Sequence, residues 1–169
     1  MAGSLYFEDI QVGYCFESQS YRIDDDEIRR FAQEFDPQPF HLNEMSGRHS
    51  LFGDLVASGW HTAALTMRLL VSANPFAGGL VGLDAEVRWR RPTRPGDEFK
   101  VFTEVIDKGP FRSRTEHGLV VIRAETRDQN EDVLQILVSR FLVPVRPKLA
   151  EVAIASGTGG PNLTEPPLS

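Results

Sequence analysis

Two side chains suited to proton transfer near neutral pH, Asp36 and His41, lie five residues apart in this chain. The segment between them contains Pro37 and Pro39, which fix two φ angles and remove two backbone donors. Each proline also pushes the residue before it, Asp36 or Gln38, away from the helical region and toward an extended backbone. We therefore expect a stiff, non-helical loop that holds a carboxylate and an imidazole in a defined relation, as a general acid/base pair requires.

A second feature with chemical potential is the pair Ser58-Gly59, which precedes an apolar run over residues 60–73 that predicts a buried helix. The first N–H groups of a helix have no partner within it and lie at the positive end of its dipole, so they suit a developing oxyanion. Gly59 has no side chain to block the approach of a carbonyl oxygen. Ser58 is a good N-cap, and two interpretations of its hydroxyl stay open: a cap alone, or a cap that also orients Asp36.

The elements that must position these residues follow from the hydrophobic pattern. A strand over residues 14–23 precedes a capped amphipathic helix over residues 24–34 and a short helix over residues 43–50. After the buried helix, the pattern predicts strands over residues 83–90, 99–106, 119–127 and 133–145. Their connections are too short for crossover helices, so we expect antiparallel pairing. The predicted fold class is α+β, with a curled antiparallel sheet wrapped around one long buried helix.

Length and composition limit the domain organisation. The chain has 169 residues, of which 41% are hydrophobic, and we predict one domain over residues 1–146. Residues 147–169 are rich in Pro, Gly, Ser and Thr and predict a flexible C-terminal tail. A net charge of −6 argues against a nucleic-acid partner. No apolar run reaches about 18 residues, the length of a membrane span, and residues 1–9 have neither a basic start nor an apolar core, so we expect no membrane partner and no signal peptide.

Cysteine and histidine usage bears on compartment and metals. Cys15 is the one cysteine, so no disulfide within the chain is possible, and we expect a cytoplasmic protein. A nucleophilic role for Cys15 is open, but its place at the start of a predicted strand favours a packed residue. The four histidines lack the spacing of a compact zinc motif, so we expect no metal site.

The segment Asp36-Pro37-Gln38-Pro39-Phe40-His41 resembles the Asp-x-Asn-Pro-x-His motif of the (R)-specific enoyl-CoA hydratases, also called MaoC-like dehydratases. Gln38 stands where that motif has Asn, which keeps the amide and adds a methylene. Residues 52–53 and 56–59 resemble the family's approach to its central helix, and the similarity extends over about residues 6–145. The resemblance implies a hotdog fold and (R)-specific hydration of a 2-enoyl-CoA, or the reverse dehydration of a 3-hydroxyacyl-CoA.

The resemblance also implies the partners and the roles of the site residues. It implies a homodimer, or a higher oligomer of dimers, with two sheets joined edge to edge, and no cofactor beyond the coenzyme A of the acyl thioester substrate. We assign Asp36 as the principal base and His41 as its partner, which orients the water and relays the proton, although the two can titrate as one unit. Ser58 and Gly59 are assigned to substrate binding at the thioester oxygen.

Other residues have two interpretations each. The basic cluster Arg88, Arg90, Arg91 and Arg94 suits the phosphates of coenzyme A, but exposed strands also carry such charges. His61 is expected to take a hydrogen-bonded packing role, with the acyl pocket as the alternative. The same choice between core and acyl tunnel applies to three aromatic residues, with the core as the default: Phe40, Trp60 and Phe76.

Two other functions remain open. A hotdog thioesterase would use Asp36 and His41 to direct water at the thioester carbonyl rather than at Cβ. A non-catalytic acyl-CoA-binding hotdog domain would need neither side chain for chemistry. The proline-flanked spacing of the pair before the central helix favours the hydratase over the thioesterase. The presence of both residues argues against the binding domain.

Overall fold

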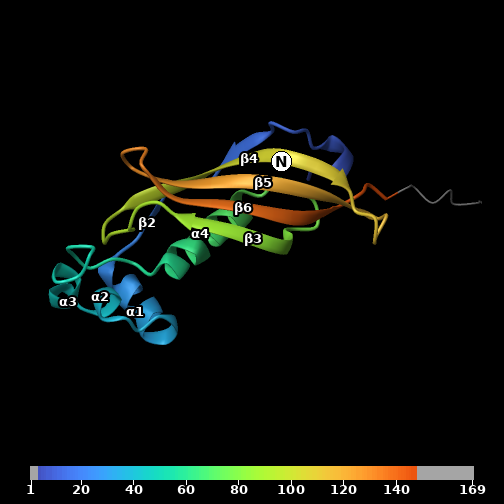
Figure 1. Ribbon diagram of the computed structural model, residues 1–169. Coiled ribbons are helices and arrows are strands. Elements are labelled where there is room, and N and C mark those ends of the chain that lie inside the picture. Colours follow the sequence, from blue (N-terminus) through green and yellow to red (C-terminus); the bar gives the residue numbers. More distant parts are fainter. Residues whose placement is uncertain (1–3, 148–169) are drawn as a thin grey trace, which may run out of the picture.

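One antiparallel sheet of six strands forms the body of the molecule (Figure 1). In the computed structural model, which describes residues 4–147, the strand order is β1-β4-β5-β6-β3, and β2 also pairs with β4. The strands are β1 Cys15–Glu17, β2 Tyr21–Arg22, β3 Val81–Trp89, β4 Glu98–Pro110, β5 His117–Asp128 and β6 Val133–Pro144. The predicted α+β class and the hotdog arrangement of a curled sheet on one long helix are confirmed. Beyond residue 147, the predicted tail lies outside the described residues.

The long helix α4, Gly59–Ala73, packs along one face of the sheet (Figure 1). Its buried side chains recur at helical spacing on the sides that face the sheet and helix α1, Asp25–Phe35: His61, Thr62, Leu65, Thr66, Leu69 and Leu70. The prediction of a helix buried on most faces is wrong in extent, because Trp60 and Val71 are 62% and 55% exposed. A single sheet covers one face of a helix, so the opposite face stays open to solvent in the single chain. None of the described helices is long and apolar enough to cross a membrane.

The strands confirm the period-two pattern and correct one boundary. In β4, Val101, Thr103 and Val105 are buried while their neighbours are not, as alternation across a half-covered sheet requires. The predicted strand over residues 14–23 is instead two strands, β1 and β2. Four steps from Glu17 to Tyr21 face three steps from Phe102 to Phe99, and the extra residue breaks the ladder.

The side chain of Cys15 corrects a second expectation. We expected a packed residue, but Cys15 in β1 is exposed. It pairs with Glu104 from the three-residue strand β1, which lies at one end of the strand order. Its thiol makes one weak contact with the carbonyl of Gly13, at 3.3 Å. Position in a strand predicted the pairing of Cys15 but not the face on which its side chain would lie.

Three short helices gather at one end of the sheet, near the start of α4 (Figure 1). They are α1 Asp25–Phe35, α2 Pro39–Leu42 and α3 Glu44–Arg48; a 3₁₀ turn, η1 Phe7–Asp9, lies near the N-terminus. The predicted capping box of α1 is confirmed, since the Glu27 amide donates to Asp24 Oδ1 at 2.8 Å.

The segment between α1 and α2 corrects the predicted non-helical loop. Asp36 leaves the helical region at φ −149°, ψ 69°, and Gln38 is extended at φ −81°, ψ 141°, as expected before proline. However, residues from Pro39 onward form the single turn α2, which contains His41. Proline is favoured at the first position of a helix because its missing N–H would have had no partner there.

Candidate active site

Asp36 lies directly after α1, and both of its carboxylate oxygens accept hydrogen bonds. The Ser58 hydroxyl donates to Oδ2 at 2.6 Å, and the Gln38 side-chain amide donates to Oδ1 at 2.9 Å. The Ser58 hydroxyl also accepts from the Trp60 amide at 3.2 Å, so it caps α4 and binds Asp36 at once. Of the two interpretations left open for Ser58, the geometry agrees with the second. A residue in the cap of α4 thus fixes a carboxylate at the end of α1.

These contacts favour the charged form of Asp36. The hydrogen bond from Ser58 lowers the pKa of the Asp36 carboxyl, and the Gln38 amide and nearby His41 lower it further. Burial acts in the opposite direction but does not outweigh them, so the pKa lies below its ordinary value. Asp36 is therefore ionised throughout the neutral range.

His41 is 5% exposed and is oriented by the backbone. Its Nδ1 lies 2.7 Å from the carbonyl oxygen of Val56, and the Val56 amide returns a bond of 3.4 Å to the carbonyl of Phe40. Because a carbonyl only accepts, Nδ1 carries the proton, and in neutral His41 the other nitrogen, Nε2, presents a lone pair. Nε2 is 3.5 Å from Asp36 Oδ2. Two acceptors at that distance suit a proton donor, such as a water molecule, that bonds to both.

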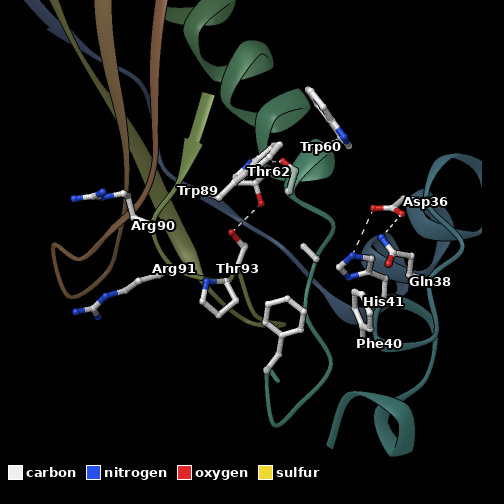
Figure 2. A pocket seen from close by; sticks show the side chains of 14 residues that line it. Asp36, Gln38, Phe40, His41, Trp60, Thr62, Trp89, Arg90, Arg91 and Thr93 are labelled. Atoms are coloured by element: carbon white, nitrogen blue, oxygen red, sulfur yellow. Dashed lines mark hydrogen bonds and ion pairs between the residues drawn. The ribbon is translucent and has the colours of Figure 1, made fainter. Parts of the chain in front are cut away.

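A cavity of about 430 Å³ opens beside this pair (Figure 2). One wall, which we call the acid/base wall, consists of Asp36, Gln38, Phe40 and His41. The facing wall, which we call the framework wall, consists of Gly59, Thr62, Trp89 and Thr93. The volume lies in the range of small-molecule sites.

The framework wall contains the start of α4 and a tryptophan that the sequence did not single out. The Gly59 amide donates to no acceptor in residues 4–147, so it is available to a ligand. However, a Cβ on Gly59 would lie 2.6 Å from the indole of Trp89. Trp89 therefore packs on the Cα of Gly59, and this contact is a second reason for a glycine here, besides the predicted access for an oxygen. The alternation in β3 places Trp89 on the same face as Ala85 and Val87, but it gave no signal that the indole would contact Gly59.

The four arginines do not act as one cluster. Arg90 and Arg91 border the cavity, and Figure 2 shows both extending away from Asp36 and His41. Arg91 forms an ion pair with Asp132. Arg94 donates to the carbonyl of Phe52 at 2.9 Å, and Arg88 pairs with Glu86 outside this cavity.

The remaining aromatic residues and His61 divide between cavity and core. Phe40 and Trp60 line the cavity, against the core default, whereas Phe76 is 4% exposed in the core, as predicted. His61 is packed, but by stacking on Phe31 at 4.5 Å rather than by a hydrogen bond. Its Nδ1 has no partner among the described residues, and burial lowers the pKa of its imidazole.

Comparisons with known proteins agree with this architecture. Residues 11–128 match the family model described as a MaoC like domain. The crystal structure of a MaoC-like dehydratase from Rhodospirillum rubrum is 47% identical, with a TM-score of 0.83, and the match covers 86% of this chain and 100% of that chain. The uncharacterized protein YdeM of Bacillus subtilis is 30% identical over 75% of this chain and 90% of its own length. A 3-hydroxybutyryl-CoA dehydratase of Methylorubrum extorquens is 34% identical over 65% of this chain and 69% of its own length.

Proposed function

This chain belongs to the family of MaoC-like dehydratases, and on that premise we propose that it hydrates a 2-enoyl-CoA, or dehydrates the 3-hydroxyacyl-CoA in the reverse reaction. The observation that carries the proposal is the pair of Asp36 Oδ2 and His41 Nε2, 3.5 Å apart at a cavity. The relative named a 3-hydroxybutyryl-CoA dehydratase supports an acyl-CoA of this kind. The (R) configuration at Cβ is the expectation that comes with the family motif.

In this proposal the water that adds to the double bond lies between the two acceptors. It donates one hydrogen toward Asp36 Oδ2 and the other toward His41 Nε2, which aims its oxygen lone pair at Cβ of the substrate. As the C–O bond forms, the pair takes one proton from the water, and it then returns one proton to Cα. Both transfers occur on the same side of the double bond, which makes the addition syn.

The structure leads us to change which of the two residues we assign as the main proton acceptor. We assigned Asp36 as the principal base, but donors on both of its oxygens and a lowered pKa make its carboxylate a weak one. Nε2 of His41 presents a lone pair for a proton, because Nδ1 donates to the carbonyl of Val56. We therefore propose that His41 takes the larger share of the proton, while Asp36 orients the water and stabilises the imidazolium.

The thioester oxygen requires a donor while Cα carries the developing negative charge. The unpaired Gly59 amide at the start of α4 meets that need in the proposal, in the way that helix N-termini serve oxyanions generally. Arg90 and Arg91 at the cavity border suit the phosphates of coenzyme A. Coenzyme A is the only cofactor-like group that the mechanism requires, as part of the substrate.

We further propose that the partner of this chain is a second copy. Strand β3 is a nine-residue edge that pairs only with β6 among the described residues, and Val81 and Leu83 are 54% and 45% exposed on it. Long uncovered edges with apolar side chains favour further strand pairing. Two β3 strands related by a two-fold axis would pair antiparallel and join two sheets edge to edge. Sedimentation at micromolar concentration should give a dimer, and a Leu83→Arg variant should weaken it; a monomeric wild-type protein would refute this part.

One assay separates the proposed activity from its rivals. Crotonyl-CoA and longer or branched enoyl-CoAs are incubated with the protein while enoyl absorbance and free thiol are both followed. Loss of absorbance without thiol release supports the hydratase. Thiol release supports the thioesterase, and measurable acyl-CoA binding with neither change supports the non-catalytic domain. The stereochemistry of the 3-hydroxyacyl product, resolved on a chiral column, tests the (R) assignment.

A further inference from the structure

The indole of Trp89, the last residue of β3, holds the first turn of α4. Its ring lies against the Cα of Gly59, so closely that a Cβ there would be 2.6 Å away. Its Nε1–H is shared between the carbonyl of Gly59, at 2.9 Å, and Oε1 of Gln135, at 3.0 Å. Trp60 packs edge-on against the same indole, with ring centroids 5.2 Å apart. The start of the helix is therefore fixed to β3 by both shape and a hydrogen bond.

Gln135, which accepts a hydrogen bond from the Trp89 indole, is buried, and both of its side-chain polar atoms are paired. It is 0% exposed, and its Nε2 donates to Thr66 Oγ1 at 3.1 Å. Thr66, on α4, also lies 2.6 Å from the hydroxyl of Thr126 on β5. A buried side-chain amide is costly unless its polar atoms are paired, and here the indole satisfies Oε1 while Thr66 satisfies Nε2. Gln135 thus has a defined orientation that determines where the indole N–H can bind.

The segment after β3 reinforces the same turn. The carbonyl of Thr93 accepts from the Ala57 amide at 2.9 Å, and its hydroxyl accepts from the Thr62 hydroxyl at 2.9 Å. Contacts from this segment therefore flank Ser58 and Gly59 on both sides in the sequence. From this turn, the Ser58 hydroxyl donates to Asp36 on the acid/base wall, and the Gly59 amide is the group that we assign to the thioester oxygen of the substrate.

We propose that Trp89, held by Gln135, is a positioning residue of the active site that fixes the Ser58 hydroxyl and the Gly59 amide relative to Asp36. Trp89 does not exchange a proton with the substrate; it acts through the turn that it clamps. The catalytic part of this inference rests on the proposed hydration. The structural part, a clamp on the first turn of α4, does not.

The kinetic test uses Trp89→Phe, Gln135→Met and the double variant. Trp89→Phe keeps an aromatic ring without the N–H, and Gln135→Met keeps the length of the side chain without the acceptor. Each should lower kcat about tenfold and leave KM within about twofold, because the substrate contacts remain while the donors move. Both changes remove the hydrogen bond between Trp89 and Gln135, so the loss in the double variant should be smaller than the product of the two single losses. Multiplicative losses in the double variant would overturn the coupling.

The matched control is Ser139→Ala. Ser139 lies on β6 like Gln135, is 2% exposed, and donates to the carbonyl of Asp84 on β3, so its replacement removes a buried contact between the same two strands. It does not line the cavity. Its kcat should stay within about twofold of the wild type. A tenfold loss in this control would show that kcat responds to any weakening of the contact between β3 and β6, and it would overturn the specific role of Trp89.

A readout without substrate tests the clamp itself. Trp60 and Trp89 are 62% and 45% exposed, but only the Trp89 indole N–H has acceptors among the described residues. In hydrogen-exchange NMR of the full chain, it should therefore exchange at least about tenfold more slowly than that of Trp60. Gln135→Met should accelerate the exchange of the Trp89 indole and of the amides that open α4, and Ser139→Ala should not. Unchanged exchange in Gln135→Met would overturn the clamp. If the wild-type protein shows no hydratase activity, the proposed function fails, while this experiment still decides the clamp.

Discussion

The two walls of the cavity are built in different ways. The acid/base wall comes from one short segment, in which Asp36 and His41 lie five residues apart. The framework wall combines the start of α4 with the end of β3 and the segment that follows it, and Gly59 and Trp89 are 30 residues apart. The first wall holds the titratable groups. The second holds an amide, an indole and two hydroxyls, none of which titrates near neutral pH.

Variants of the two walls should therefore lose activity for different reasons. On the acid/base wall, a conservative change removes a proton acceptor and leaves the surrounding contacts nearly intact, so activity should fall without a loss of fold. On the framework wall, a substitution moves the Gly59 amide or the Ser58 hydroxyl without removing it. A second substitution that restores the position should then restore activity, so double variants are the informative experiments.

The largest effect is expected from removing either titratable group. Asp36→Asn and His41→Gln should each lower turnover at least about 10²-fold, because positioned proton transfer contributes about that much. Turnover is measured with the enoyl-CoA assay and the fold with thermal unfolding. Near-wild-type turnover in either variant would mean that the acid/base wall has been assigned the wrong chemistry.

A smaller loss, about tenfold to 10²-fold in kcat, is expected for Gly59→Ala, since the new Cβ collides with the Trp89 indole. The double variant Gly59→Ala/Trp89→Ala removes the collision. Its kcat should be close to that of Trp89→Ala alone, because the added methyl group meets no indole there. If the double variant is much slower than Trp89→Ala, the glycine is also needed for access of the thioester oxygen, as the sequence first indicated.

Ser58 joins the two walls, so its removal should affect both the rate and its pH dependence. Ser58→Ala should lower kcat/KM about tenfold, in line with the loss of a hydrogen bond to a charged group. The hydroxyl lowers the pKa of Asp36, so its loss raises that pKa. In the proposal Asp36 must be ionised to orient the water and stabilise the imidazolium, so the acid limb of the kcat/KM profile that follows ionisation of Asp36 should move to higher pH. Gln38→Ala should move the limb in the same direction but less, because Gln38 is exposed. An unshifted limb in Ser58→Ala would show that ionisation of Asp36 does not control that limb.

The smallest effect is expected at a residue outside both walls. Cys15 is exposed in β1, and its thiol contacts only the carbonyl of Gly13. Cys15→Ser should leave turnover unchanged and alter the free energy of unfolding by less than about 0.5 kcal/mol, as is usual for surface positions. Equilibrium urea unfolding and the hydration assay measure both quantities. A loss of activity would instead support a nucleophilic role for Cys15.

Much of the fold could be predicted because its signals are local. Alternating residues located β3 to β6, and the Asp24 capping box located the start of α1. The prediction failed where pairing or packing decided the outcome. An extra residue opposite β4 split the first strand into β1 and β2, and Pro39 began the turn α2 instead of preventing it.

The sequence by itself determined which groups can move a proton. Asp36, His41, Ser58 and Gly59 were all identified from residue type and spacing, because those properties belong to the residue and its near neighbours. Tertiary structure alone decided how these groups are held. The carbonyl of Val56 sets the tautomer of His41, the Ser58 hydroxyl lowers the pKa of Asp36, and Trp89 with Gln135 positions the turn that carries the Gly59 amide. Each of these contacts joins residues at least 15 positions apart, so each depends on how α1, α2, α4 and the sheet pack together, which no local pattern encodes.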